Sequence, residues 1–300
     1  MKKSTVSLGI PAYNEEKNIK PLLKSLLEQK LTKVKLNEII IISDGSTDGT
    51  IEEAQSLKSR YLKIIKHKKR SGSRAIQNEI VNRANANVLI ILNADVLPVG
   101  RNFIEEITAP ILRNSKVGLV GADTISASPK TWVEKIIATS HELKKEIYKK
   151  INKGSNVYLC HGRARAFSRD FYSQIKWPDD CPEDPYSYFL CIKNGFKFVF
   201  APKAKVLFRS PATFKDHLKQ SSRFFEGKEK LKLHFDKQLV EQEYQIPTFK
   251  RLRAVVKFMF ISPIITTIYL IIYHYIKFFS PIIGVDQAKW EVSTSTKDVI

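Results

Sequence analysis

Cysteine is scarce in this 300-residue chain, which carries only three. They are odd in number and lack Cys-x-x-Cys spacing, at Cys160, Cys181 and Cys191. This pattern argues against a disulfide framework and a zinc site, and it fits a reducing compartment. The first five residues lead into a short strand, with no apolar core of a signal peptide. We therefore expect the main domain to be cytoplasmic.

Acidic residues are also in deficit, because 30 Asp and Glu face 50 Lys and Arg, a net charge of +20. Such an excess suggests a polyanionic partner, which could be nucleic acid, an acidic membrane surface or a phosphorylated substrate. The basic residues are dispersed along the chain and form no recognised nucleic-acid-binding motif. We therefore expect no nucleic-acid partner, and a solvated surface is the simplest interpretation of each basic cluster.

Strand-like and helix-like segments alternate from residue 5 to about residue 121. This repetition predicts an α/β fold with a mostly parallel sheet, right-handed crossovers and helices on both faces. The expected strands are 6–10, 38–42, 61–66, 88–92 and 117–121. The following region is less regular, with expected helices near 130–150 and 212–236 and short strands near 157–159, 197–200 and 206–208.

Long hydrophobic runs are rare, and the exception is residues 258–276, which contain no Asp, Glu, Lys or Arg. At about 1.5 Å per residue this run just reaches a bilayer core of roughly 30 Å. It predicts a transmembrane or re-entrant segment, although an in-plane helix and a buried helix remain alternatives. The expected organisation is a main domain over 1–236, a basic amphipathic connector over 237–257, this segment, and a tail over 277–300.

Polar residues follow two of the expected strands directly. Asn93-Ala94-Asp95 comes after strand 88–92, and Ser43-Asp44-Gly45 comes after strand 38–42. Open α/β sheets bind ligands at the carboxyl ends of their strands, and a carboxylate there can hold a divalent cation against phosphate oxygens. Asp44 could accept the imide N–H of a pyrimidine base. Ordinary turns are the alternative for both segments.

The order of these pieces resembles the family 2 glycosyltransferases, which have the GT-A three-layer fold. The resemblance covers residues 4 to about 230. It rests on Pro11-Ala12-Tyr13-Asn14-Glu15, on 43–50, on a helix start at 72–78 and on the strand that ends in Asp95. It implies that a sugar is transferred with inversion from a nucleotide-diphosphate donor, with assistance from Mg²⁺ or Mn²⁺.

The same resemblance implies roles for individual residues. Asp95 would bind the metal, while Asn93 stands where the family has the first Asp of Asp-x-Asp and could still contact a ribose. Ser43 likewise stands where an Asp is usual. The remaining donor-binding residues would be Pro11, Ala12, Tyr13, Glu15, Asp44, Arg74 and Asn78.

Two downstream segments complete the resemblance. Pro182-Glu183-Asp184 resembles the family's Glu-Asp pair, which makes Asp184 the expected catalytic base. Carboxylates at a helix start are also favoured by the helix dipole alone. Gln220-Ser221-Ser222-Arg223-Phe224 resembles the Gln-x-x-Arg-Trp element of glycan chain synthases, so Arg223 would hold the donor pyrophosphate. The expected acceptor-binding residues are Gly162, Glu183, Gln220 and Phe224.

The leading hypothesis is a membrane-associated inverting glycosyltransferase with a cytoplasmic catalytic domain. It would use a nucleotide-sugar donor, UDP-linked rather than GDP-linked, and a lipid-linked or growing glycan acceptor. Alternatives are a polysaccharide synthase subunit that works with a membrane partner and a degenerate, non-catalytic glycan-binding homologue. A nucleotidyltransferase is disfavoured because residues 11–15 contain no glycine for a phosphate loop.

Overall fold

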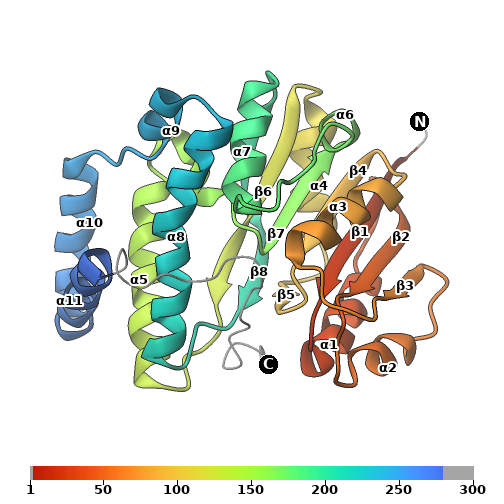
Figure 1. Ribbon diagram of the computed structural model, residues 1–300, viewed down its shortest axis with the longest axis horizontal. Helices are drawn as coiled ribbons and strands as arrows, with labels where there is room; N and C mark the ends of the chain where they lie inside the picture. The colour runs from red at the N-terminus through yellow and green to blue at the C-terminus, as the bar shows by residue number, and fades with distance from the viewer. Residues whose placement is uncertain (1–2, 280–300) are drawn as a thin grey trace.

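The computed structural model describes residues 3–279, without the side chains at positions 219, 222–225, 276–277 and 279. Its centre is an eight-stranded sheet in the order β3-β2-β1-β4-β7-β6-β8-β5 (Figure 1). The strands are β1 (Ser4–Ala12), β2 (Val34–Ser43), β3 (Leu62–Lys66), β4 (Val88–Leu92), β5 (Val96–Pro98), β6 (Val117–Ser126), β7 (Ala164–Ser168) and β8 (Lys197–Phe208).

The sheet is mixed, with a parallel half and an antiparallel insertion. Strands β3, β2, β1 and β4 pair in parallel, as the sequence predicts. β7 then lies antiparallel between β4 and β6, and β5 is antiparallel to β8. Leu92 at the end of β4 pairs with Ala164 at the start of β7. The antiparallel pairing therefore brings the residues after β4 beside the residues before β7.

Helices cover both faces of the sheet because its strands are apolar on both sides. Ile39 and Ile41 of β2 pack in one core, and Ile40 and Ile42 pack in the other. The first core includes α1 (Glu16–Leu27), α2 (Thr50–Gln55) and α4 (Phe103–Arg113). The second includes α3 (Ser73–Arg83), α6 (Arg169–Tyr172) and α7 (Glu183–Lys193). The result is a three-layer α/β/α fold.

The remaining long helices form the left side of the molecule in Figure 1. α5 (Trp132–Tyr148) carries Leu143 and Ile147 into a third apolar cluster, which also contains Ala254 and Tyr269. The other helices are α8 (Phe214–His234), α9 (Lys237–Glu243), α10 (Thr248–Ile261) and α11 (Pro263–Phe279). α10 and α11 thus pack on α5 through a small core of their own.

Several sequence predictions need correction. Residues Val157–Leu159 form a 3₁₀ turn and no strand, and the two expected strands at 197–200 and 206–208 are one strand, β8. Short strand β5 was not predicted.

The predicted transmembrane or re-entrant segment over 258–276 is not one continuous helix in the structure. The chain breaks at Ser262, and Pro263 begins a new helix, where its missing N–H costs no hydrogen bond. The predicted boundary at 258 falls inside α10. Among residues 3–279, no helix has both the length and the apolar character needed to cross a membrane. The predicted tail lies outside the described residues from position 280 onward.

Candidate active site

Three chain segments meet at the carboxyl end of β4. The Asn93 N–H donates to the carbonyl oxygen of Arg163 at 3.0 Å, which extends the β4–β7 pairing past the strand end. Gly162 lies directly against Asp184, because a Cβ placed on Gly162 would overlap Oδ1 of that carboxylate. The turn with Asp95, the start of β7 and the start of α7 therefore share one edge of the sheet.

Asp184 is the accessible carboxylate of this edge. It lies in the first turn of α7, where the helix dipole favours a negative charge, and its side chain is 39% exposed. Nη2 of the buried Arg165 lies 3.8 Å from Oδ1 of Asp184. An accessible carboxylate in this position can accept a proton from a bound hydroxyl group.

Arg165 is the buried side chain that holds the start of α7 in place. Its Nη1 donates to the Glu183 carbonyl at 3.1 Å and to Ser187 Oγ at 2.8 Å, and its Nη2 donates to Gln77 Oε1 at 2.8 Å. Fully buried charges are stable only when paired and hydrogen-bonded. Arg165 therefore connects β7, α3 and α7 behind the accessible carboxylate.

Glu183 belongs to this internal network and does not face an acceptor. Its side chain is 3% exposed and accepts a hydrogen bond from Ser73 Oγ at 2.7 Å. Burial, and next the charge of Asp184, raise the pKa of the Glu183 carboxyl above its usual range. The predicted acceptor-binding role of Glu183 is therefore corrected to a positioning role.

Arg163 lies directly before β7, in a turn that the family resemblance places facing the sugar and the acceptor. Its guanidinium packs over the Phe208 ring at 3.7 Å. Burial lowers the pKa of Arg163, while the nearby carboxylates of Asp95 and Asp184 act in the opposite direction. An arginine stays charged even so, and Arg163 thus supplies a positive charge close to both acids. No spacing in the sequence reveals this, because the pairing of β4 with β7 creates the proximity.

The residues predicted to contact the nucleoside lie where β1 and β2 end. Pro11 and Ala12 pair with the last residues of β2, and the Asp44 N–H donates to the Ala12 carbonyl at 2.8 Å. The buried Asp44 carboxylate accepts the backbone N–H groups of Ser71 at 2.6 Å and Gly72 at 2.8 Å. Asp44 therefore holds the loop before α3, and its contact with a base stays a prediction.

Tyr13 and Glu15, two other predicted donor-binding residues, each contact another side chain near these strand ends. The Arg70 guanidinium lies 4.2 Å from the centroid of the Tyr13 ring, so a base that stacks on that face would displace it. The buried Glu15 accepts a hydrogen bond from Asn18 Nδ2 at 2.8 Å. Arg70 thus lies beside a predicted donor-binding residue, a position that the sequence did not indicate.

The two predicted donor residues on α3 differ in placement. Asn78 is turned away from the strand tips, because its side chain donates to the Trp177 carbonyl at 2.9 Å and accepts the Trp177 N–H at 2.8 Å. Each end of its amide has a backbone partner, which indicates a positioning role, and its contact with a donor stays a prediction. Arg74 is buried in the first turn of the same helix.

The synthase-like element lies on α8. Gly227 of this helix packs against Pro182, since a Cβ on Gly227 would lie 2.9 Å from Pro182 Cγ. α8 therefore runs close to the start of α7, and Gln220 is half-buried earlier on the same helix. The side chains of Arg223 and Phe224 lie outside the described residues.

The comparisons with known proteins give the family and the fold of this chain. The family model described as glycosyl transferase family 2 matches residues 7–176, more than half of the chain. The chain belongs to this family. The mannosyltransferase PcManGT from Pyrobaculum calidifontis, solved with GDP-Man and Mn²⁺, matches with a TM-score of 0.63 at 17% identity. The match covers 96% of this chain and 78% of PcManGT.

Other similar proteins carry transferase names. Glycosyltransferase AglE of Haloferax volcanii is 30% identical over 158 residues, which cover 51% of this chain and 51% of AglE. A dolichol-phosphate mannosyltransferase of Pyrococcus furiosus is 34% identical over 92 residues, 30% of this chain and 26% of that protein. The chain thus spans about half or less of these curated relatives. S. aureus TarS 1-349 matches with a TM-score of 0.55 at 18% identity, covering 73% of this chain and 64% of TarS 1-349. The fold of this family 2 glycosyltransferase is GT-A-like, with a mixed sheet.

The turn after β4 in this glycosyltransferase provides few ligands for a divalent cation. Across residues 3–279 no group of three His, Cys, Asp or Glu side chains is arranged to hold a metal ion. Asp95 provides one carboxylate, and Asn93 provides only a neutral oxygen. Mg²⁺ commonly binds through one or two carboxylates together with substrate phosphates and water. The residues present therefore fit a cation that arrives with a diphosphate.

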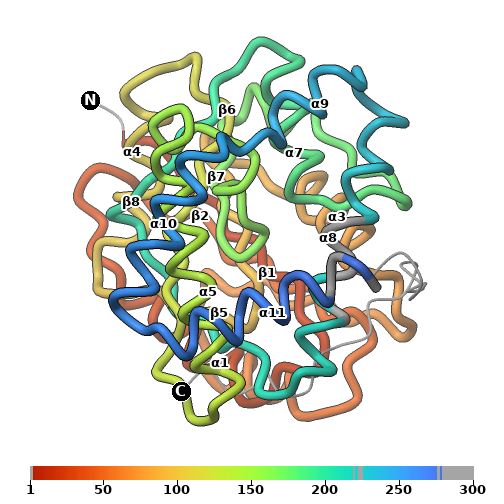
Figure 2. The backbone as a smooth tube through the Cα atoms, turned by 90° about the vertical axis from the view of Figure 1, so that its left-hand side faces the viewer, coloured from red at the N-terminus to blue at the C-terminus, as the bar shows by residue number. Residues whose placement is uncertain are grey.

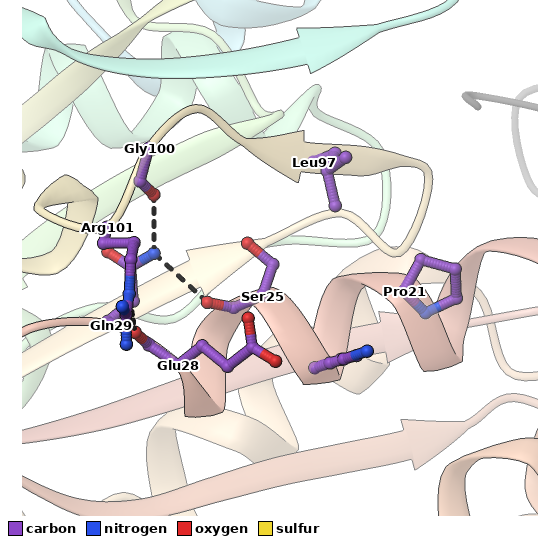
Figure 3. Close-up of a pocket in the computed structure, with 8 residues that line it drawn as sticks. Pro21, Ser25, Glu28, Gln29, Leu97, Gly100 and Arg101 are labelled. Atoms are coloured by element: carbon purple, nitrogen blue, oxygen red, sulfur yellow. Dashed lines mark hydrogen bonds between the residues drawn. The ribbon is translucent and has the colours of Figure 1, made fainter.

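A shallow groove of about 280 Å³ lies elsewhere, between α1 and the turn after β5 (Figure 3). Gln29 Nε2 donates across it to the Gly100 carbonyl at 2.9 Å, and also to the Ser25 carbonyl of α1 at 3.1 Å. None of its lining residues belongs to the edge described above, and its hydrogen bonds tie the turn to α1. We assign it a structural role.

Proposed function

We propose that this chain is an inverting glycosyltransferase that moves a sugar from a nucleotide-diphosphate donor to a hydroxyl group of a lipid-linked or growing glycan acceptor. The reaction would take place at the cytosolic face of a membrane. The observation that carries the proposal is the placement of Asp184, which is accessible, held by a buried arginine network and adjacent to the turn with Asp95.

The proposed step needs one base opposite the leaving group. The acceptor oxygen attacks the anomeric carbon of the donor sugar and gives its proton to Asp184. The bond from that carbon to the β-phosphate oxygen breaks on the opposite face, which inverts the configuration. The nucleoside diphosphate leaves with the bonding electron pair, so the Asp184 carboxyl ends protonated and later loses its proton to solvent.

The developing charge on the diphosphate needs positive partners. A bound Mg²⁺ or Mn²⁺ would offset this charge by binding phosphate oxygens. Asp95 would hold that ion, and Asn93 would accept a hydrogen bond from the ribose. Arg163 lies near both acids and would hold the leaving diphosphate as a fixed cation. This role for Arg163 would compensate for the charge that Asn93 lacks.

The proposed donor is a UDP-sugar, because a carboxylate at position 44 can accept the imide N–H of uracil. PcManGT is described with GDP-Man and TarS with UDP-GlcNAc, so the fold accommodates either nucleotide. Thermal unfolding measured with UDP, GDP and dTDP sugars, each with and without Mn²⁺, tests the choice. A larger rise in melting temperature with a GDP-sugar would contradict it.

Asp184→Asn tests the catalytic assignment. We expect turnover to fall by about 10²–10⁴-fold, because the amide cannot accept the proton, while donor affinity stays close to wild type. Asp179→Asn is the matched control, since Asp179 is an exposed acid five residues earlier in the chain. Product formation and donor binding are measured on the same samples. Unchanged turnover in Asp184→Asn would remove Asp184 as the base.

The second candidate function is that of a non-catalytic glycan-binding protein. It is supported by Asn93, which stands where the family has an acid. The loss of one acid from Asp-x-Asp leaves a single carboxylate at the strand tip. Such a protein would bind a nucleotide-sugar or a glycan without turnover at any concentration of Mn²⁺ or Mg²⁺. Measurable product that disappears in Asp184→Asn decides against this candidate.

A further inference from the structure

The α10–α11 hairpin, residues Thr248–Phe279, exposes apolar side chains to a degree seen nowhere else in the described part of the chain. Ten of the fifteen exposed large hydrophobic residues lie on these two helices. On α10 the exposed residues Phe249, Leu252, Val256 and Phe260 recur at helical spacing, opposite Ala254, which is buried. Phe260 is 87% exposed.

α11 repeats the pattern of α10. Its exposed residues Ile264, Ile271, Tyr275 and Phe278 share one side, while Ile265 is buried on the other. Figure 2 shows that α10 and α11 both lie across the same face of the molecule, in front of α5. The two apolar stripes thus belong to one broad face, and the chain reverses between them at Ser262.

The charges on this hairpin are all of one sign. The segment 248–279 contains no Asp or Glu, while α10 carries Lys250, Arg251, Arg253 and Lys257. By helical spacing these cations lie between the buried side of α10 and its exposed apolar stripe. Long basic side chains in this position can bury their stems in an apolar phase and keep their charges at its polar boundary.

We propose that the α10–α11 hairpin is an in-plane docking surface for an anionic lipid bilayer. The apolar stripes enter the boundary between headgroups and acyl chains, and the basic residues of α10 contact anionic headgroups. The absence of Asp and Glu from the hairpin favours an anionic lipid surface, although Lys257 already pairs with Glu146 of α5 at 3.3 Å. The proposal deepens the membrane location given under the proposed function and does not depend on the transfer reaction.

The docking surface is connected to the active edge through α8. The Phe214 ring of α8 lies 6.2 Å from the Tyr275 ring of α11. The same helix packs through Gly227 against Pro182, which precedes the Glu183–Asp184 pair. α8 therefore connects the hairpin with the segment that carries the proposed base. A bilayer bound at the hairpin would place the hydroxyl or phosphate groups of its lipids on this side of the molecule.

Vesicle flotation of the full chain tests this inference. We expect binding to phosphatidylcholine vesicles that contain phosphatidylserine, weaker binding to pure phosphatidylcholine, and a decrease as salt rises. Phe260→Ser with Ile264→Ser should lower the affinity at least about tenfold, because both side chains leave the apolar phase. Arg251→Gln with Arg253→Gln should lower it roughly fivefold per residue on anionic vesicles only.

Two control variants match these changes outside the hairpin. Leu233→Ser removes a side chain that is 75% exposed on α8, and Lys17→Gln with Lys24→Gln neutralises two exposed cations on α1. Both should bind as wild type does. Thermal unfolding of each variant checks that it folds, and donor binding without vesicles is measured separately, so failure of the transfer proposal would leave this test intact.

Three results would overturn the proposal. The first is no flotation of the wild-type chain with anionic vesicles. The second is an equal loss of binding in the control variants. The third is a wild-type dimer that Phe260→Ser with Ile264→Ser converts to a monomer of unchanged vesicle affinity, because a second copy of the chain would then cover the hairpin.

Discussion

At the scale of single residues, Gly162 sets the position of the proposed base. A Cβ at this position would overlap Asp184 Oδ1, so Gly162→Ala must displace the carboxylate. We expect kcat to fall by about 10–100-fold, since small misplacements of a reacting group are costly. The free energy of unfolding should change by less than about 1 kcal/mol, because the carboxylate is partly exposed and can swing aside.

Gly195→Ala is the control for this prediction and should give the reverse pattern. Gly195 has a φ of +78° with open space around its Cα, so alanine there is strained without touching the active edge. We expect a loss of stability of about 1 kcal/mol at normal kcat. Steady-state kinetics and thermal unfolding of both variants check the pair. A normal kcat for Gly162→Ala would show that the Asp184 position is not critical.

The turn after β4 carries a single carboxylate, that of Asp95, as the proposed metal ligand. Asn93→Asp would add a second carboxylate beside Asp95, and ligand charge is a main determinant of affinity for hard cations. We expect the concentration of Mn²⁺ that gives half-maximal activity to fall on the order of tenfold. Asn114→Asp, an exposed change at the end of α4, should leave it unchanged. An unaltered Mn²⁺ response in Asn93→Asp would separate position 93 from the metal.

At the scale of elements, one side chain joins α3 to the segment before α7. Asn78→Ala leaves the backbone N–H and carbonyl of Trp177 without the partners that Asn78 provides. We expect a loss of about 1–3 kcal/mol in the free energy of unfolding, with donor affinity unchanged. Asn82→Ala, exposed on the same helix, should cost less than about 0.5 kcal/mol. A specific loss of donor affinity in Asn78→Ala would support its predicted donor contact.

The parallel half of the sheet could be predicted because its strands are short apolar runs with helical segments between them. β4 is buried along its whole length, and Asp95 follows it as expected. β7 was harder to foresee, since nothing local in Ala164–Ser168 states that it runs antiparallel between β4 and β6. The site depends on that insertion, which is why Asp184 was predicted from its motif while the proximity of Arg163 and Arg165 to the acids was not.

The apolar segment near the C-terminus shows how composition can mislead at this scale. Hydropathy summed over 258–276 predicts one continuous apolar segment, yet α10 ends at Ile261, inside that segment, and Pro263 begins α11. The two shorter helices then share their apolar side chains between α5 and the surface. Composition therefore located an unusual segment correctly but could not give its shape.

At the scale of the whole molecule, a neutral histidine holds the α5 layer to the sheet. His141 Nε2 of α5 lies 3.1 Å from Thr124 Oγ1 of β6, and its ring packs edge-on against Phe208 of β8. Burial, and next the positive charge of Arg163, lower the pKa of His141 to about 3, with smaller contributions from Lys145 and Lys144. The same two causes lower the pKa of His161 well below its usual value.

These lowered pKa values predict acid sensitivity for the packing of the layers. The unfolded chain takes up protons near pH 6.5, whereas the folded chain leaves His141 neutral until about pH 3. Between these values the unfolded state binds more protons, so the free energy of unfolding falls as the pH falls. Thermal unfolding from pH 7 to pH 4 should therefore show a shallower decline for His141→Gln than for wild type, with the remaining slope partly due to His161. Parallel curves for the two proteins would mean that His141 is already protonated in the folded state, and that the α5 layer is not held by a neutral ring.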